Sequence, residues 1–335
     1  MDVRPVLLEV QGLTTHFPLD EGLVRAVEGV SFVLRQGETL GVVGESGCGK
    51  SVMARSIMRI VPSPGQIVGG RITYFRPSGM GREAIELTAL DPKGNELRNI
   101  RGMEISMIFQ EPMSSLSPVH TIGEQIIEAV QLHQRFSETA ARQAAIEMLA
   151  AVAMPEPERI LERYSYELSG GMCQKAMIAM ALVCHPSLLI ADEPTTALDV
   201  TTEAQILRLL RSLQQRLDMA TLFITHNLGV IAQLTQRVIV MYLGRVVEEA
   251  DVDALFYNPL HPYTRALLRS IPRPGRRGQE RLYAIRGTVP PPYAHLAGCP
   301  FHPRCPEMQP GLCDVREPAW LHVDAAHWVR CILYE

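Results

Sequence analysis

The chain has 335 residues, of which 47% are apolar and 20% are charged, and its formal net charge is −4. This composition excludes a disordered chain, and the length allows one large domain and a smaller one. The small negative charge gives no general attraction to nucleic acid. The first residues lack the apolar segment of a secretion signal, so we expect a cytosolic protein that is soluble by itself.

The first informative element in chain order is a strand that leads into a glycine-rich loop. Leu40–Val43 predict a buried strand, and a helical pattern follows the loop. The loop spacing, Gly-x-x-x-x-Gly-Lys-Ser, is that of a phosphate-binding loop in its expected context. Backbone amides of such a loop surround phosphate oxygens, while the lysine reaches the β- and γ-phosphates and the serine binds Mg²⁺. We therefore expect a nucleotide site formed by Gly44, Glu45, Ser46, Gly47, Cys48, Gly49, Lys50 and Ser51.

Three later apolar stretches also end in polar side chains. "MIFQEP" ends in Gln110, "LLIADEP" in Asp192 and Glu193, and "ATLFITH" in His226. At the carboxyl ends of central strands, Asp192 can hold Mg²⁺ through water and Glu193 can orient or deprotonate an attacking water. Plainer alternatives exist, because the two acids can cap the next helix and a lone histidine is usually structural. The phosphate loop favours the functional interpretation, although Gln110 alone is a weak signal.

The region between Gln110 and the acidic strand end is predicted to be helical. "TIGEQIIEAVQLH" and "SETAARQAAIEMLAAVA" have apolar residues at three- and four-residue spacing. A plain helical insertion that packs on itself is enough to explain these two stretches. In "YELSGGMCQK", Ser169 can cap a helix, and Gly170 and Gly171 leave its first amides bare. Such a helix end attracts an anion.

The seven cysteines are unevenly distributed, and the last four crowd the C-terminal end. They follow a linker-like stretch, Pro272–Arg281, which suggests a domain boundary. In a cytosolic chain we expect thiols or metal ligands and not disulfides. A short segment seldom folds on apolar burial alone, so four soft ligands favour a metal, with His302 as a possible substitute. The candidate ligands are Cys299, Cys305, Cys313 and Cys331.

Taken in order, "GESGCGKS", "MIFQEP", "LSGGM", "LLIADEP", "TALD" and "ITH" resemble the ATP-binding subunits of ABC transporters. The signature "LSGGM" distinguishes this family from other phosphate-loop ATPases, which lack it. The resemblance covers about Val6 to Asp251 and implies an α/β phosphate-loop ATPase core with a helical subdomain at about 115–185. In this family two such domains enclose two ATP molecules, and the loop of one faces the signature of the other. Contacts to a nucleotide held by a second chain are thus implied for Ser169, Gly170 and Gly171.

The resemblance also implies a role for each strand-end residue. Glu193 becomes the general base, and His226 contacts the γ-phosphate and the attacking water. Gln110 senses Mg²⁺ and the γ-phosphate and couples to membrane subunits. Asp199, in "TALD", lies across the dimer and helps to fix the opposite site. Phe17 resembles the aromatic residue that stacks on adenine, although it can equally belong to the core. The implied Mg²⁺ ligands are Ser51, Gln110 and Asp192.

The C-terminal region resembles that of oligopeptide/dipeptide importer ATPases, a branch that also includes nickel importers. The resemblance is carried by "NPLHPYTRALLRSIP" (Asn258–Pro272) and the four cysteines. It implies an ATPase domain at 1–257 and a small cysteine-rich domain at 258–335. Some members of the branch carry a [4Fe–4S] cluster at such cysteines, which is the preferred cofactor here besides ATP and Mg²⁺, with Zn²⁺ second.

The same resemblance implies the partners and the location. They are a second, different ATPase chain, two integral membrane permease subunits and, indirectly, an extracytoplasmic binding protein. The chain then lies peripherally on the cytoplasmic face of the cell membrane, and its ATP hydrolysis powers import of peptides or a related small solute.

Two other functions share part of this pattern. A phosphate-loop kinase or GTPase has no use for "LSGGM". The alternative is a soluble ABC ATPase with a zinc-type C-terminal module that acts on nucleic acid or in translation. Asp314, Glu317 and Asp324 in the tail argue against strong phosphate contact, so we expect no nucleic-acid partner.

Overall fold

The structure is a computed structural model that describes residues 4–78, 81–271, 284–294, 296–324 and 326–335. The chain divides into two compact units. The first unit is built around Ala89–Ile224, with two short segments from earlier in the chain. The second unit combines Leu8–Val33, Thr39–Thr88 and Thr225–Glu335.

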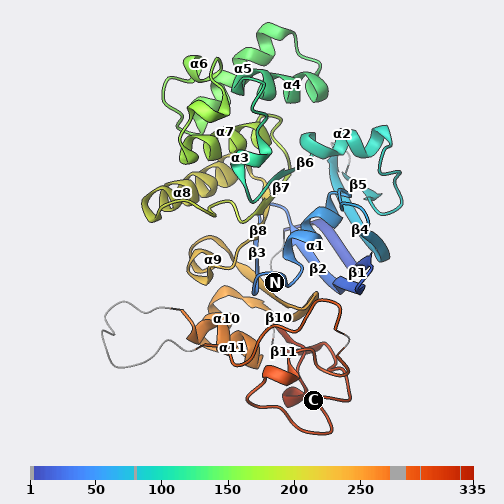
Figure 1. Ribbon diagram of the computed structural model, residues 1–335. Helices are drawn as coiled ribbons and strands as arrows, with labels where there is room; N and C mark the ends of the chain where they lie inside the picture. Colours follow the sequence, from blue (N-terminus) through green and yellow to red (C-terminus); the bar gives the residue numbers. More distant parts are fainter. Residues whose placement is uncertain (1–3, 79–80, 272–283, 295, 325) are drawn as a thin grey trace. The chain divides into compact units, whose positions relative to one another are not determined.

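The first unit combines parallel strands with helices (Figure 1). Strand β6 pairs with β7 and β7 with β8, so that Ile108 lies opposite Ala191 and Asp192 opposite Ile224. Every residue of these strands is buried, as expected for parallel strands covered on both faces. The elements are α2 (Asn95–Met103), β6 (Ile105–Ile108), α3 (Pro112–Ser115), α4 (Ile122–Gln134), α5 (Glu138–Ala151), α6 (Pro157–Ile160), η1 (Ser165–Glu167), α7 (Gly170–Leu182), β7 (Leu188–Asp192), α8 (Val200–Leu217) and β8 (Ala220–Ile224).

The predicted helices of the first unit are confirmed, with caps at their starts. Thr121 and Glu124 form a reciprocal capping box at the start of α4, and Ser137 caps α5. Helix α7 packs against α3, α4, α5 and β6. Contact on several sides explains why the residues after Gly171 are apolar around most of the helix.

The second unit contains two sheets. In the first, the strand order is β2-β1-β4-β5. In the second, β3 pairs with β9 in parallel, and β9, β10, β12 and β11 continue it in antiparallel pairs. The elements are β1 (Val6–Leu19), β2 (Gly22–Arg35), β3 (Thr39–Val43), α1 (Lys50–Ile57), β4 (Gln66–Ser78), β5 (Gly81–Glu86), α9 (Leu228–Leu234), β9 (Arg237–Tyr242), β10 (Arg245–Asp251), α10 (Val252–Tyr257), α11 (Pro262–Arg269), η2 (His302–Arg304), β11 (Leu321–Asp324), β12 (His327–Val329) and η3 (Ile332–Tyr334).

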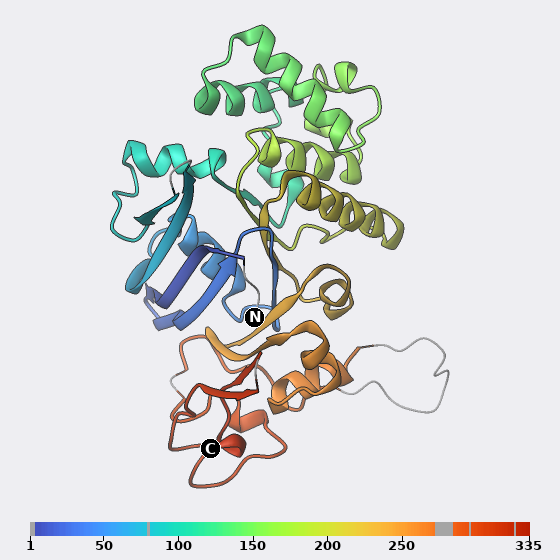
Figure 2. The same cartoon turned by 180° about the vertical axis from the view of Figure 1, so that it is seen from behind.

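The C-terminal segment does not form a unit of its own, so the expected small cysteine-rich domain is not supported. Strand β12 pairs with β10, with Val329 opposite Glu248. The C-terminal segment, drawn in red, lies beside β10 (Figures 1 and 2). Leu260, Val329 and Cys331 form a buried cluster against which Leu333 and Tyr334 pack. The segment therefore shares strands and apolar burial with residues of the second unit, whereas the sequence boundary after residue 257 stays a prediction.

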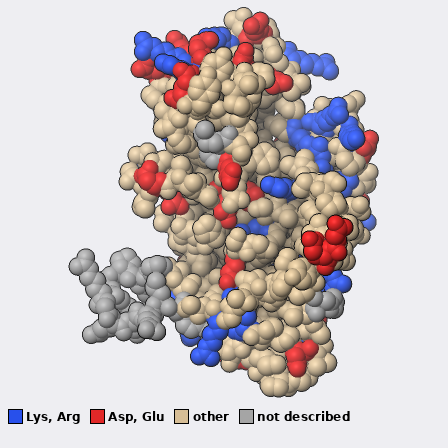
Figure 3. Space-filling view, in the orientation of Figure 1, with Lys and Arg blue, Asp and Glu red and all other residues tan. Residues whose placement is uncertain are grey.

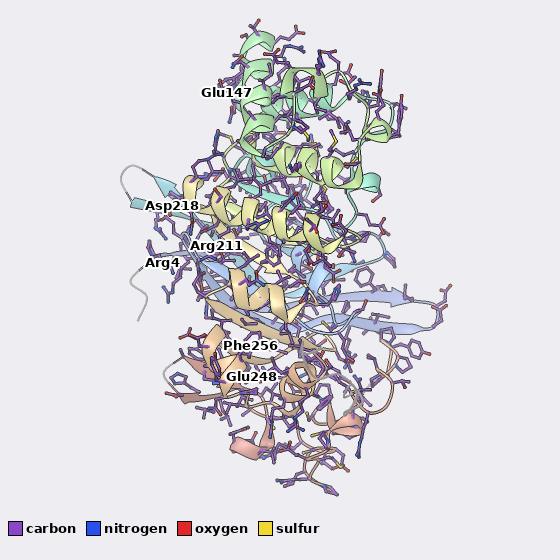
Figure 4. The ribbon with its side chains drawn as sticks, turned by 90° about the vertical axis from the view of Figure 1, so that its left-hand side faces the viewer. Arg4, Glu147, Arg211, Asp218, Glu248 and Phe256 are labelled. Atoms are coloured by element: carbon purple, nitrogen blue, oxygen red, sulfur yellow. The ribbon has the colours of Figure 1, made fainter. Side chains whose placement is uncertain are left out.

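A buried carboxylate ties this segment to β10. Glu248 is fully buried, and its oxygens accept hydrogen bonds from the backbone N–H groups of Leu260 (2.7 Å) and His261 (2.9 Å). Nε2 of His327 lies 2.7 Å from the same carboxylate. Glu248, labelled in Figure 4, thus joins the start of α11 and strand β12 to β10.

We expect Glu248→Ala to lower the free energy of unfolding by about 3–5 kcal/mol, because the change removes one partner of a buried polar group. Urea unfolding of the purified chain measures it. Glu317→Ala is the matched control, since Glu317 pairs with Arg245 and Arg330 with 45% of its side chain exposed. The control should change stability by less than about 1 kcal/mol. Equal losses in both variants would show that the buried carboxylate has no special role.

Candidate nucleotide site

The phosphate loop lies between β3 and α1, as the sequence predicts. Two of its glycines lie directly against other backbone. A Cβ at Gly49, where φ is +101°, would lie 2.0 Å from the carbonyl oxygen of Ala26. At Gly44, where φ is +156°, it would lie 2.2 Å from the carbonyl oxygen of Met241. A larger residue at either position requires the backbone to shift.

The loop holds its lysine amine close to its own carbonyl groups. Lys50 is 4% exposed, and its Nζ donates to the carbonyl oxygens of Gly44 (2.9 Å) and Glu45 (3.1 Å). The thiol of Cys48 lies beside the amine, and burial raises the pKa of this thiol. Ser46 and Gly47, in contrast, are exposed. The loop therefore presents its middle to solvent over a buried positive charge.

In the first unit, two predicted site residues are in direct contact. Nε2 of Gln110, two residues after β6, donates to Oε2 of Glu193 at 3.1 Å. The hydroxyl of Thr196 donates to the same oxygen at 3.0 Å. Glu193 has a φ of +47°, which is uncommon outside glycine, and its N–H donates to Ile224 at 2.9 Å. The preceding Asp192 ends β7 and is 2% exposed.

The signature residues begin α7 and lie near Asp199. Oγ of Ser169 accepts a hydrogen bond from the N–H of Met172, and Ser169 and Gly170 are exposed. A Cβ at Gly170 would meet no atom within 4 Å, whereas one at Gly171 would lie 2.8 Å from the Thr202 methyl group. Asp199 caps α8, and its hydrogen bonds from Thr202, led by the hydroxyl group, lower its pKa. In the isolated chain Asp199 therefore has a capping function.

Two other predicted residues lie in the second unit. Phe17, in β1, is half-buried, and a Cβ at Gly65 would lie 2.4 Å from its ring. This contact is what a core residue makes, and stacking on adenine stays a prediction. His226 is exposed and follows the end of β8 by two residues.

The four C-terminal cysteines line one pocket, together with Phe301, His302 and other residues. Burial raises the pKa of the Cys299 thiol to about 11 and that of Cys331 to about 12, so both are protonated at neutral pH in the absence of a cation. Among the residues that the structure describes, no group of three or more potential ligands has the arrangement of a metal site. The described side chains therefore do not form the preassembled iron–sulfur or zinc site that the sequence predicts, although the four cysteines line one pocket.

The structure adds contacts to the phosphate loop that the sequence analysis missed. The backbone N–H of Glu45 donates to the hydroxyl of Tyr263 at 2.8 Å. The guanidinium of Arg304 donates to both carboxylate oxygens of Glu45, at 2.7 and 3.0 Å. Tyr263 lies within the "NPLHPYTRALLRSIP" stretch, but nothing in that stretch indicates contact with a residue more than 200 positions away.

Comparison with known proteins places these residues in a family. Residues 27–196 match the ABC transporter family. The chain is also 51% identical to a probable peptide ABC transporter ATP-binding protein of Sinorhizobium fredii, over 97% of this chain and 94% of that protein. This chain therefore belongs to the ATP-binding proteins of ABC transporters. It is therefore an ATPase whose hydrolysis of ATP drives transport.

Other relatives and solved structures agree with this assignment. The ABC protein is 48% identical to the oligopeptide transport ATP-binding protein AppD of Bacillus subtilis, over 98% of this chain and 97% of that one. Residues 247–313 match the C-terminal region of oligopeptide/dipeptide transporters. A dimeric structure of a bacterial ABC transporter cassette matches with a TM-score of 0.63 and 27% identity, covering 73% of this chain and 99% of that one. No helix in the described part of the ABC protein is long and apolar enough to cross a bilayer.

Proposed function

We propose that this ABC protein powers import of di- and oligopeptides or a related small solute. One observation carries the proposal. Residues 27–196 match the ABC transporter family, and residues 247–313 match the C-terminal region of oligopeptide/dipeptide transporters. The relatives named for peptide or dipeptide transport align with nearly the whole chain, including the dipeptide transport ATP-binding protein DppD of Escherichia coli, at 45% identity over 93% of this chain.

In the proposed mechanism the first unit supplies the residues that activate water. Glu193 is the general base, and the hydrogen bonds from Gln110 and Thr196 orient its carboxylate. Asp192 would hold Mg²⁺, which would stabilise the negative charge on the transferred phosphate. In the second unit the loop amides and Lys50 bind the phosphates, His226 contacts the γ-phosphate, and Phe17 stacks on adenine. Ser51 would also hold Mg²⁺.

We further propose that the signature acts on a nucleotide held by a second ATPase. The exposed start of α7 at Ser169 and Gly170 supports this proposal, because backbone amides at a helix start attract phosphate. Asp199 then contacts the opposite site. A similar cassette has been solved as a dimer in a post-hydrolysis state bound to ADP and Pi. In our proposal the partner is a different ATPase chain.

The proposed assembly also contains two integral membrane permease subunits, which bind near Gln110. Closure of the ATPase pair moves these subunits. An extracytoplasmic binding protein delivers the cargo to them. The chain then lies peripherally at the cytoplasmic face of the membrane.

The alternative of a soluble, nucleic-acid-directed ATPase has no comparable support. On the face shown in Figure 3, basic and acidic side chains are interspersed, especially at the helical end of the first unit. The same unit also contains exposed ion pairs, such as Arg142 with Glu162 and Arg163 with Glu167. Strong binding to nucleic acid instead needs a run of basic side chains.

Glu193→Gln tests the assigned base. We expect steady-state ATP hydrolysis to fall by on the order of 10²–10⁴ with ATP affinity unchanged, because the amide cannot accept a proton. Phosphate release and nucleotide titration measure the two quantities. Glu158→Gln, an exposed acid at the start of α6, is the control and should retain full activity. Full activity in Glu193→Gln would assign the base elsewhere.

Transport itself can be measured in proteoliposomes that contain the ABC protein, its partner ATPase and the permease subunits. We expect ATP-dependent uptake of a labelled dipeptide or oligopeptide when the binding protein is added. The same assembly with Glu193→Gln should show no uptake. A chain that copurifies with nucleic acid and never with membrane subunits would favour the soluble alternative.

We also propose that the cysteine-lined pocket holds a metal centre, a [4Fe–4S] cluster in preference to Zn²⁺. The support is the donor set, since Cys299, Cys305, Cys313 and Cys331 line the same pocket. A bound centre would tie together segments of the C-terminal region that are separated in sequence.

After anaerobic purification we expect iron and acid-labile sulfide in the wild-type chain and visible absorbance, and their loss in Cys331→Ser. Cys184→Ser is the control, because Cys184 is buried outside the pocket and lies in the first unit. A colourless protein that contains zinc would exclude the cluster. Protein without either metal would exclude both centres.

A further inference from the structure

The C-terminal segment contacts the phosphate loop through a bidentate, partly buried ion pair. Both oxygens of the Glu45 carboxylate accept hydrogen bonds from the Arg304 guanidinium, at 2.7 and 3.0 Å. The Arg304 side chain is 4% exposed and that of Glu45 is 24% exposed. The fork geometry of this pair fixes orientation as well as charge, which a lysine at the same position cannot do.

Neighbouring groups hold Arg304 in one orientation. Its Nε donates to the carbonyl oxygen of Arg286 at 3.1 Å, and its Nη1 lies 3.4 Å from the hydroxyl of Tyr242. The Tyr242 ring packs against Tyr263 and Phe301, with ring centroids 4.7 and 5.3 Å away. Hydrogen bonding to Glu45 is the main cause of the raised pKa of Arg304. The charge on Arg304 is therefore permanent and directed at one residue of the loop.

The position of Glu45 affects two parts of the loop that contact phosphate. Its carbonyl oxygen accepts a hydrogen bond from Nζ of Lys50, and its N–H donates to Tyr263. Its carboxylate also places a negative charge within a loop that receives a polyphosphate. Without a neutralising partner, that charge repels the ligand in surroundings of low dielectric.

We propose that Arg304 is a positioning residue for ATP binding: it neutralises Glu45 and fixes the start of the phosphate loop. The C-terminal segment is then part of the nucleotide site, although it touches no phosphate itself. This inference rests on the assignment of the phosphate loop as the ATP site. It does not depend on a peptide cargo or on a metal in the cysteine-lined pocket.

A double-mutant cycle tests the proposal, with Arg304→Gln, Glu45→Gln and the double variant. We expect Arg304→Gln to weaken ATP binding by roughly 5–150-fold, the range typical of coupling between sites. Glu45→Gln should have a smaller effect than Arg304→Gln, because it removes the charge that would repel the phosphates. The double variant should recover most of the affinity, since the loop then carries neither charge. Titration with a fluorescent ATP analogue measures each affinity.

The kinetic result separates positioning from general damage to the fold. We expect Arg304→Gln to raise KM for ATP while kcat at saturating ATP stays close to that of the wild type. Arg304→Lys, which keeps the charge without the fork, should have an intermediate affinity. Arg316→Ala is the matched control, because Arg316 is 57% exposed and pairs with Glu335 in the same C-terminal region. It should bind ATP like the wild type, and thermal unfolding should confirm that each variant is folded.

Two results would overturn the proposal. One is wild-type affinity in Arg304→Gln. The other is a double variant that binds ATP as weakly as Arg304→Gln, because a purely structural defect is not relieved by removing the charge on Glu45. If the wild-type chain itself bound no ATP, the assignment of the phosphate loop would fail, which is a separate outcome.

If Arg304→Gln does not fold, Arg304→Lys and Glu45→Gln decide. We expect weaker ATP binding in Arg304→Lys, where the Glu45 carboxylate remains without its bidentate partner, than in Glu45→Gln, where the charge is gone. Equal ATP affinity in these two variants would overturn the proposal.

Discussion

The phosphate loop is confined by close contact between backbone segments, and the rest of the site depends on this contact. At Gly44 and Gly49 the carbonyl groups of Met241 and Ala26 leave no room for a Cβ. The turn between β9 and β10 adds a hydrogen bond, from the N–H of Gly244 to the carbonyl oxygen of Cys48, at 2.9 Å. The surrounding strands therefore hold the loop before any ligand arrives. A loop held in this way loses little conformational entropy when it binds phosphate.

The predicted site residues of the first unit have different surroundings. In the first unit, the turn after β7 places Glu193 in a conformation with positive φ, and Gln110 and Thr196 hold its carboxylate. Such a conformation costs free energy and persists only where the surroundings enforce it. At the start of α7, in contrast, Ser169 and Gly170 are exposed to solvent. A carboxylate held by two hydrogen bonds and an exposed helix start suit the proposed site that a second chain completes.

The C-terminal segment is tied to the second unit by polar groups as much as by apolar burial. Glu248 accepts hydrogen bonds from the start of α11 and contacts His327 of β12, and Arg304 reaches Glu45 from η2. Arg304 is also the residue before Cys305, one of the thiols that line the shared pocket. A change in that pocket that moves η2 would also move Arg304, and Arg304 contacts Glu45 of the phosphate loop directly.

The sequence by itself predicted the phosphate loop, several strands and several helices of the first unit. The spacing of the phosphate loop, the cap at Ser169 and the apolar strand before Asp192 are local, so a few neighbouring residues encode them. Only the tertiary structure decided that the cysteine-bearing segment adds strands to the second unit, contrary to the expected separate domain. It alone revealed the pair of Glu45 and Arg304, which are 259 positions apart. Such contacts form only when the whole chain has folded. Local periodicity therefore carries no information about which distant charge the partly buried Glu45 carboxylate will meet.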